Sequence, residues 1–227
     1  MPRFTLIALT GPVGAGKDSV ADYLVQHAGF MKLAFADALR AEILDGFDLI
    51  DHPDILSNRA TKESPHPALA LRNCVKFGFI GAVATAMHAC VDSAWLDAPR
   101  SPRQILQWWG TEYRRRQDEQ YWITRMAGKI GVHRGNGQQR IAITDCRFRN
   151  ELAFVHAVGG KLWRVDRAGL PAVEVAHASA VPLPDEGVAL TLRNDAGLQE
   201  LRAGVLRQWW ALDAQIPAEQ LRVEIMQ

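Results

Sequence analysis

Apolar runs of strand length recur along this chain, and segments with helical periodicity separate them. The runs occupy residues 4–9, 31–35, 141–144, 161–165 and 188–192. Each is dense enough in apolar residues to be buried on both faces of a sheet. Strands that alternate with helices require right-handed crossovers, so the sequence predicts a three-layer α/β/α fold with a parallel sheet of about five strands.

Two helices are predicted directly from apolar stripes between these runs. The first stripe is Val20, Leu24, Val25 and Ala28, and the second is Leu152, Val155 and Val158, closed by Gly159-Gly160. A last helix is expected after Asn194-Asp195, which can cap it, with Leu198, Leu201, Val205 and Trp209 on one face.

The middle of the chain, residues 38–140, is predicted to be a mainly helical insertion on the substrate side. Its polar, proline-containing stretch 51–67 is expected to be loop. Ser101-Pro102-Arg103-Gln104 is a helix start, with Ser101 as N-cap and Gln104 completing a capping box. The helix then carries Trp108 and Trp109 toward Gly110.

Composition excludes several classes of protein. The chain has 227 residues with a formal net charge of +1, so no global basic field indicates nucleic acid or a membrane surface as partner. Its three cysteines are widely spaced and support neither a disulfide framework nor a zinc site, which favours a reducing cytoplasm. The first apolar run is too short for a signal peptide, and no segment is predicted to span a membrane.

The sequence from Gly11 to Lys17 matches G-x-x-x-x-G-K and lies between a predicted strand and a predicted helix. Gly14 and Gly16 allow backbone N–H groups to turn inward around phosphate oxygens, and the helix dipole and Lys17 add positive charge. The predicted phosphate-binding residues are Gly11, Val13, Gly14, Ala15, Gly16, Lys17, Asp18 and Ser19. A tight strand-to-helix turn with an exposed lysine is the alternative, and it does not explain a lysine after three spaced glycines.

Asp18 stands where this motif normally carries Ser or Thr. The usual hydroxyl binds Mg²⁺, and a carboxylate can bind the ion or one of its waters, with Ser19 sharing the shell. Alternatively, Asp18 is a negative charge favourably placed in the first turn of a helix. Both interpretations remain open at this stage.

Five blocks together resemble the phage-type deoxynucleoside monophosphate kinases, a family of P-loop kinases. The blocks are GKDSVADYL, FADALR, SPRQILQWWGTEYRR, ITDCRFRNE, and the tail from His177-Ala-Ser179 to Asn194-Asp-Ala-Gly-Leu-Gln-Glu-Leu. They follow the family's order and cover nearly the whole chain. The resemblance implies ATP and Mg²⁺ as cofactors and a small deoxynucleoside monophosphate as acceptor, which can include modified bases.

The resemblance also implies an acceptor site. Its expected residues are Phe35, Asp37, Arg40, Lys62, Trp109, Glu112, Arg114 and Asp145. Asp37 would orient the nucleotide, and Arg40 would hold its monophosphate with two hydrogen bonds. The alternative for these two is a helix N-cap and a solvated arginine.

The segment QWWGTEYRRR combines aromatic rings, which can stack on a base, with guanidiniums, which can pair with phosphates. Arg114 is the arginine favoured for substrate. Core packing is the alternative for at least one of Trp108 and Trp109, and a solvated charge run is the alternative for the arginines.

ITDCRFRNE places Asp145 at the carboxyl end of a predicted strand, where open α/β sheets bind ligands. Asp145 is expected to hold a water of Mg²⁺, which makes Asp18, Ser19 and Asp145 the metal candidates. Arg147 is expected to reach phosphate oxygens. A structural Asp145–Arg147 pair is the alternative. Asn150 is expected to cap the next helix, with Glu151 in its first turn.

A lid is expected within residues 164–180, with Arg167 swinging over the transferring phosphoryl group. His177 and Ser179 match a family block, but Ala180 replaces the glutamate of that block. Lys17, Arg147 and Arg167 are therefore the catalytic candidates.

These observations lead to one principal hypothesis, transfer of the γ-phosphoryl of ATP to a deoxynucleoside 5′-monophosphate. Two alternatives remain: a P-loop kinase of another phosphorylated acceptor, of the phosphomevalonate or dephospho-coenzyme A type, and a nucleotide-dependent switch without small-molecule transfer. The Trp209-Trp210 pair fits either a homodimer contact or the core.

Overall fold

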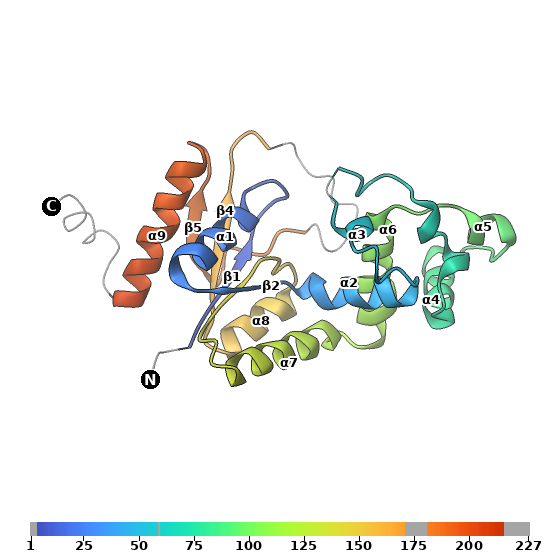
Figure 1. The fold of residues 1–227 in the computed structure, drawn as a ribbon, viewed down its shortest axis with the longest axis horizontal. Coiled ribbons are helices and arrows are strands. Elements are labelled where there is room, and N and C mark those ends of the chain that lie inside the picture. Colours follow the sequence, from blue (N-terminus) through green and yellow to red (C-terminus); the bar gives the residue numbers. More distant parts are fainter. Residues whose placement is uncertain (1–3, 59, 171–180, 216–227) are drawn as a thin grey trace. The chain divides into compact units, whose positions relative to one another are not determined.

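The computed structural model describes residues 4–58, 60–170 and 181–215. Its sheet contains β1 (Thr5–Thr10), β2 (Met31–Leu33), β3 (Arg140–Ile143), β4 (Lys161–Asp166) and β5 (Val188–Arg193). The strands lie in the order β2-β3-β1-β4-β5, and every neighbouring pair is parallel. The predicted parallel α/β fold and its five strands are confirmed (Figure 1).

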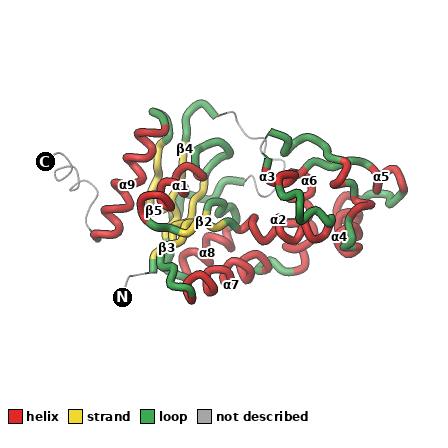
Figure 2. Tube along the Cα trace, in the orientation of Figure 1, coloured by secondary structure: helices red, strands yellow, loops and turns green. Residues whose placement is uncertain are grey.

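The chain forms two compact units. Unit 1 consists of residues 1–34 and 127–227, and unit 2 is the continuous segment Phe35–Met126. Figure 2 shows that the strands belong to unit 1, whereas helices and loops make up unit 2. Helix α7 (Tyr121–Gly135) contributes its first turns to unit 2 and its last turns to unit 1.

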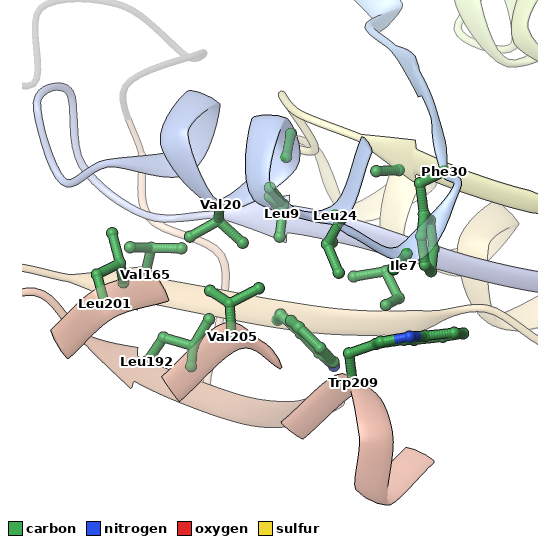
Figure 3. Packing of buried hydrophobic residues seen from close by; sticks show 14 of the residues in the cluster. Ile7, Leu9, Val20, Leu24, Phe30, Val165, Leu192, Leu201, Val205 and Trp209 are labelled. Carbon is green, nitrogen blue, oxygen red and sulfur yellow. The ribbon is translucent and has the colours of Figure 1, made fainter. Parts of the chain in front are cut away.

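One face of the sheet is covered by α1 (Lys17–Ala28) and α9 (Leu198–Ala214), which pack against each other. Every second residue of β1 and β4 points into this layer, as the alternation of side chains along a strand requires. Figure 3 shows the resulting core, in which the strand residues Ile7, Leu9, Val165 and Leu192 meet Val20, Leu24, Leu201, Val205 and Trp209 of the helices.

The opposite face carries α8 (Arg149–Ala157). A Cβ atom placed on Gly160 would come within 2.6 Å of Leu6 and 2.9 Å of Val155, so glycine allows the close approach of α8 to β1 and β4. The sheet is therefore the middle layer of three.

Unit 2 is built from short helices around an aromatic core. In chain order these are α2 (Phe35–Gly46), α3 (Asp54–Ser57), the 3₁₀-helices η1 (Pro67–Leu69) and η2 (Leu71–Asn73), α4 (Phe77–Met87), α5 (Ser93–Asp97), α6 (Pro102–Gln107) and the π-helix η3 (Trp108–Arg115). The Trp109 ring is fully buried and lies 4.5 Å from Phe79 between centroids. The predicted capping box of Ser101 and Gln104 starts α6.

Three predicted boundaries are wrong: the end of β2, the start of α8 and the start of α9. Strand β2 ends at Leu33 rather than Phe35, because the good helix formers of FADALR start α2 at Phe35, which places Asp37 inside its first turn and not at the N-cap. Helix α8 starts at Arg149, before Asn150, because the buried Glu151 carboxylate accepts the N–H groups of Arg147 (2.8 Å) and Phe148 (3.1 Å). The predicted position of Glu151 in the first turn is confirmed.

The start of α9 also differs from its prediction. Gly197 is the N-cap, and Asn194 and Asp195 bind elsewhere. Leu198 is 60% exposed, whereas Leu201, Val205 and Trp209 are buried as predicted. Burial of Trp209 assigns it to the core. The predicted stripes also err at Val25 and Val158, which are exposed.

Among the described residues, no helix combines the length and the apolar character needed to cross a membrane.

Candidate functional site

The glycine-rich loop follows β1, the central strand of the sheet. The connection that leaves β1 leads to β2 on one side, whereas β4 and β5 lie on the other side. In open α/β sheets, ligands bind beyond the carboxyl ends of the strands at such a switch point. Residues Pro12, Val13 and Gly14 are exposed there.

Three glycines shape the loop. Gly11, Gly14 and Gly16 have φ angles of +130°, +83° and +108°, which L side chains rarely adopt. A Cβ atom on Gly11 would collide with the carbonyl oxygen of Val165, and one on Gly16 would lie 2.6 Å from Asn194 Nδ2. The backbone conformation of this loop therefore depends on glycine.

Lys17 and the start of α1 supply positive charge to this loop. Lys17 Nζ donates to the carbonyl oxygens of Gly11 (2.8 Å) and Pro12 (2.7 Å), so the ammonium lies across the loop. The bond from Val20 N–H to Gly16 O (3.0 Å) opens the helix, and Gly16 provides no side-chain cap. Backbone N–H groups at such a helix start point toward an incoming anion. The residues fit the phosphates of a nucleotide.

Asn194, which the sequence predicts to be a helix cap, instead holds the loop in place through a hydrogen bond. Its side chain is buried, and Nδ2 donates to the carbonyl oxygen of Ala15 at 2.8 Å. Its own N–H donates to Asp166 O at 2.8 Å. The next residue, Asp195, accepts the N–H of Ala168 at 2.6 Å, and this bond is the main cause of its lowered pKa.

Asp18 lies on the side of α1 that faces β2. Lys32 Nζ lies 3.5 Å from the Asp18 carboxylate and 2.9 Å from that of Asp22, one helical turn later. These ion pairs support the interpretation of Asp18 as a favourable charge at the start of α1, because Lys32 contacts the carboxylates of Asp18 and Asp22 on one face of the helix. All three side chains are partly exposed, so this ion pair does not prevent Asp18 from meeting a metal ion.

Asp145 and Arg147 flank Cys146, shortly after β3. The N–H of Cys146 donates to Leu9 O at 3.1 Å, which fixes the segment after β3 against the end of β1. Asp145 is partly buried and Arg147 is exposed. Burial, with the nearby charges of Glu151 and Asp145, raises the pKa of the Cys146 thiol far above its usual range.

Among the described residues, protein side chains alone do not form a metal site. Within the part of the chain that the structure describes, no cluster of three or more His, Cys, Asp or Glu side chains is placed to hold an ion. Mg²⁺ in phosphate-transfer sites typically takes one or two protein ligands, with phosphates and waters completing its shell. Ser19 and Asp145 fit that sparse donor set, and Asp18 can join it.

In unit 2, the expected acceptor residues Asp37 and Arg40 form an ion pair at 3.5 Å. Arg40 Nε is buried and has no hydrogen-bond partner among the described residues. A buried donor left unpaired is costly, which makes this guanidinium a good candidate for ligand contact. Phe35 is buried, and Lys62 is partly exposed, with its carbonyl oxygen accepting the N–H of Arg103 at 3.0 Å.

Glu42, which the sequence analysis missed, is the centre of a polar cluster in unit 2. Its carboxylate accepts from Trp109 Nε1 (3.0 Å), Arg114 Nε (2.8 Å), Arg125 (3.1 Å) and the Tyr121 hydroxyl. Burial raises the pKa of Glu42, but the four hydrogen bonds outweigh it, and the net pKa is lowered. No local pattern marks Glu42, because a glutamate on a helix resembles any solvated charge.

Two other expected acceptor residues have local roles. The fully buried Trp109 ring packs in the aromatic core, so its polar edge reaches the cluster while its faces contact protein. Glu112 pairs with Arg116 at 3.4 Å.

Of the predicted lid, residues 164–180, the structure describes residues 164–170. Arg164 pairs with Asp185 and donates to Leu183 O at 2.7 Å, and Arg167 is exposed just after β4. His177, Ser179 and Ala180 lie outside the described residues.

The parallel sheet, the glycine loop at its switch point and the lysine at the start of α1 are features of the P-loop motif.

No protein-family model matches the chain. A curated relative from Acanthamoeba polyphaga mimivirus, named "Putative deoxynucleotide monophosphate kinase", is 27% identical over 215 residues, which cover 88% of this chain and 94% of the relative. Two solved structures are similar at 10% identity: an unliganded sugar kinase from a Janibacter species, covering 94% of this chain and 99% of its own (TM-score 0.46), and dephospho-CoA kinase from Campylobacter jejuni, covering 92% and 98% (TM-score 0.48).

Proposed function

We propose that this protein transfers the γ-phosphoryl group of ATP to a deoxynucleoside 5′-monophosphate, giving the diphosphate. The observation that carries the proposal is the glycine loop with Lys17 at the switch point of the sheet. The arginine and aromatic groups of unit 2 and the name of the mimivirus relative support a nucleotide as acceptor.

The residues of unit 1 would hold the donor nucleotide. Lys17 and the backbone N–H groups of residues 14–19 would bind the phosphates, and Ser19, Asp145 and Asp18 would bind Mg²⁺ or its waters. When bound, ATP–Mg²⁺ supplies the phosphoryl group and part of its charge neutralisation. Arg147 and Arg167 would stabilise the negative charge that spreads over the equatorial oxygens during transfer.

The residues of unit 2 would hold the acceptor, with Arg40 and Arg114 as candidates for its phosphate and Asp37 for its orientation. The acceptor oxygen belongs to a phosphate that is already ionised near neutral pH, so the reaction needs no strong general base. Positioning and charge neutralisation therefore account for the catalysis.

A panel of phosphate acceptors with radiolabelled ATP tests the proposal. It contains the common deoxynucleoside monophosphates, base-modified forms, dephospho-coenzyme A and phosphomevalonate. We expect labelled deoxynucleoside diphosphate. Labelling of a non-nucleotide alone would refute the nucleotide proposal, and slow ATP hydrolysis that no deoxynucleotide stimulates would favour a switch.

The Lys17→Ala variant tests the loop itself. We expect transfer to be lost with the fold intact, because the ammonium donates to carbonyl oxygens of the loop itself, those of Gly11 and Pro12. Lys161→Ala is the matched control, since this exposed lysine lies at the first residue of β4, at the opposite end of the strands from the loop. Near-wild-type turnover of Lys17→Ala would remove the loop from the mechanism.

A further inference from the structure

The Glu42 cluster joins three helices of unit 2 through one carboxylate. Glu42 lies on α2, Trp109 and Arg114 lie on η3, and Tyr121 and Arg125 lie on the first turns of α7. A carboxylate offers about four lone-pair positions, and here four donors from two helices converge on it. The Glu42 side chain is 13% exposed, so this convergence is shielded from water.

The π-helix explains how two of these donors reach the same acceptor. In an α-helix, residues five apart point about 140° away from each other, which would separate Trp109 from Arg114. Helix η3 instead forms i→i+5 bonds, among them that from Arg116 N–H to Thr111 O, which bring residues five apart onto one side. π-Helical turns are rare and are often found at functional sites.

The Arg114 guanidinium is held on three sides. Its Nε donates to Glu42, and its carbon lies 4.5 Å and 4.8 Å from the ring centroids of Tyr113 and Tyr121. Within the described residues, the structure gives this guanidinium no hydrogen bond besides that to Glu42. The two terminal nitrogens are the part of arginine that binds a phosphate or carboxylate as a fork.

The charge of the cluster favours an anion. One carboxylate faces the two guanidiniums of Arg114 and Arg125, which leaves a net positive charge beside aromatic rings. One guanidinium already balances the charge of the Glu42 carboxylate, so the second arginine adds a positive charge that the internal balance of the cluster does not need. Arg125 is 54% exposed and can reach a ligand while it remains bound to Glu42.

We propose that Glu42 is a positioning residue that holds Arg114 and Arg125 so that their outer N–H groups bind the phosphate of the acceptor nucleotide. This inference rests on the proposed function. It adds Glu42, Tyr121 and Arg125 to the acceptor site and gives the π-helix a role, which is to fix Arg114 before substrate arrives. A preset arginine binds more tightly than a flexible one, because less conformational entropy is lost on binding.

The test compares Glu42→Gln, Arg114→Lys and the double variant with the wild-type protein. The control is Asp97→Asn, which removes the carboxylate from an exposed arginine pair of the same unit, that with Arg72. Turnover gives the KM for acceptor and for ATP, calorimetry gives the affinity for dGMP without turnover, and thermal melting gives stability.

We expect Glu42→Gln to raise the acceptor KM and the dGMP Kd roughly 10- to 100-fold while the KM for ATP changes by less than about twofold. The effects of Glu42→Gln and Arg114→Lys should be less than additive in the double variant, because Glu42 acts in part through that arginine. The control should match the wild type in every constant.

Three results would overturn the inference: an unchanged acceptor KM with a lowered melting temperature, equal effects on both substrates, or additive effects in the double variant. If Glu42→Gln does not fold, Arg114→Lys and Arg125→Lys keep the carboxylate and its neutral donors, and an unchanged acceptor KM in both is decisive against it. The wild-type acceptor panel separates this outcome from failure of the proposed function, since a non-nucleotide acceptor would then replace dGMP in the same comparison.

Discussion

The bond between Asn194 and the phosphate loop gives the sharpest prediction in unit 1. Asn194→Ala removes the donor to the Ala15 carbonyl, which lies inside the protein at a fully buried residue. Water cannot easily replace the lost amide, because Leu201 packs against the same glycine turn, 3.3 Å from a Cβ position on Gly16.

The magnitude follows from the desolvation of an unpaired buried carbonyl. Such a group costs about 1–3 kcal/mol, so we expect the free energy of unfolding to fall by about 2 kcal/mol. For a chain of this length, the melting temperature should fall by about 4–8 °C. The loop also loses the contact that fixes Ala15 and Gly16, so the Kd for ATP should rise roughly tenfold, while the affinity for dGMP stays unchanged.

Urea unfolding, thermal melting and calorimetric titration with ATP measure these effects. Asn73→Ala is the control, since Asn73 is an exposed asparagine that donates to Pro67 O at 3.1 Å, and its loss should cost less than about 0.5 kcal/mol. Asn194→Asp keeps the size of the side chain but directs a carboxylate at the Ala15 carbonyl, so ATP binding should weaken further. Wild-type stability and ATP affinity in Asn194→Ala would refute the bracing role.

Three further predictions concern single side chains. Asp18→Ser should raise the Mg²⁺ concentration needed for half-maximal turnover, and an unchanged Mg²⁺ dependence would contradict a role of Asp18 in metal binding. The pKa of Glu42 is lowered in the folded protein, so its stabilising contribution is present above its unfolded pKa and is lost as pH falls through the folded pKa. Glu42→Gln should flatten that acid limb of stability in urea titrations against pH, and an identical limb would contradict the assignment. A thiol reagent should modify the exposed Cys90 at once but Cys146 only on unfolding, because burial raises the Cys146 pKa; rapid modification of both would be inconsistent with this packing.

The strands and the loop could be predicted from the sequence because their signals are local. A strand buried on both faces is rich in apolar residues, as in β1. The glycines at positions 11, 14 and 16 are needed for backbone angles that other residues avoid. Even there, β2 was predicted too long, since the apolar Phe35 suits a strand and a helix start equally well.

The polar partners could not be predicted because they are distant in sequence. Asn194 and Ala15 lie 179 residues apart in the sequence, and Glu42 accepts hydrogen bonds from two later helices. An asparagine before a helix looks like a cap, and only the tertiary contact shows that its side chain is used elsewhere. The π-helix leaves no periodic signal of its own, because its sequence also fits an α-helix.

The division of the chain has a consequence for folding kinetics. Unit 2 is one uninterrupted segment, whereas unit 1 must pair Thr5 of β1 with Arg140 of β3 and then add β4 and β5. Contacts between residues so far apart form slowly, because a long loop must close first. During synthesis, unit 2 can therefore form its aromatic core early. Strand β1, which leads into the phosphate loop, cannot pair until β3 and β4 have been synthesised.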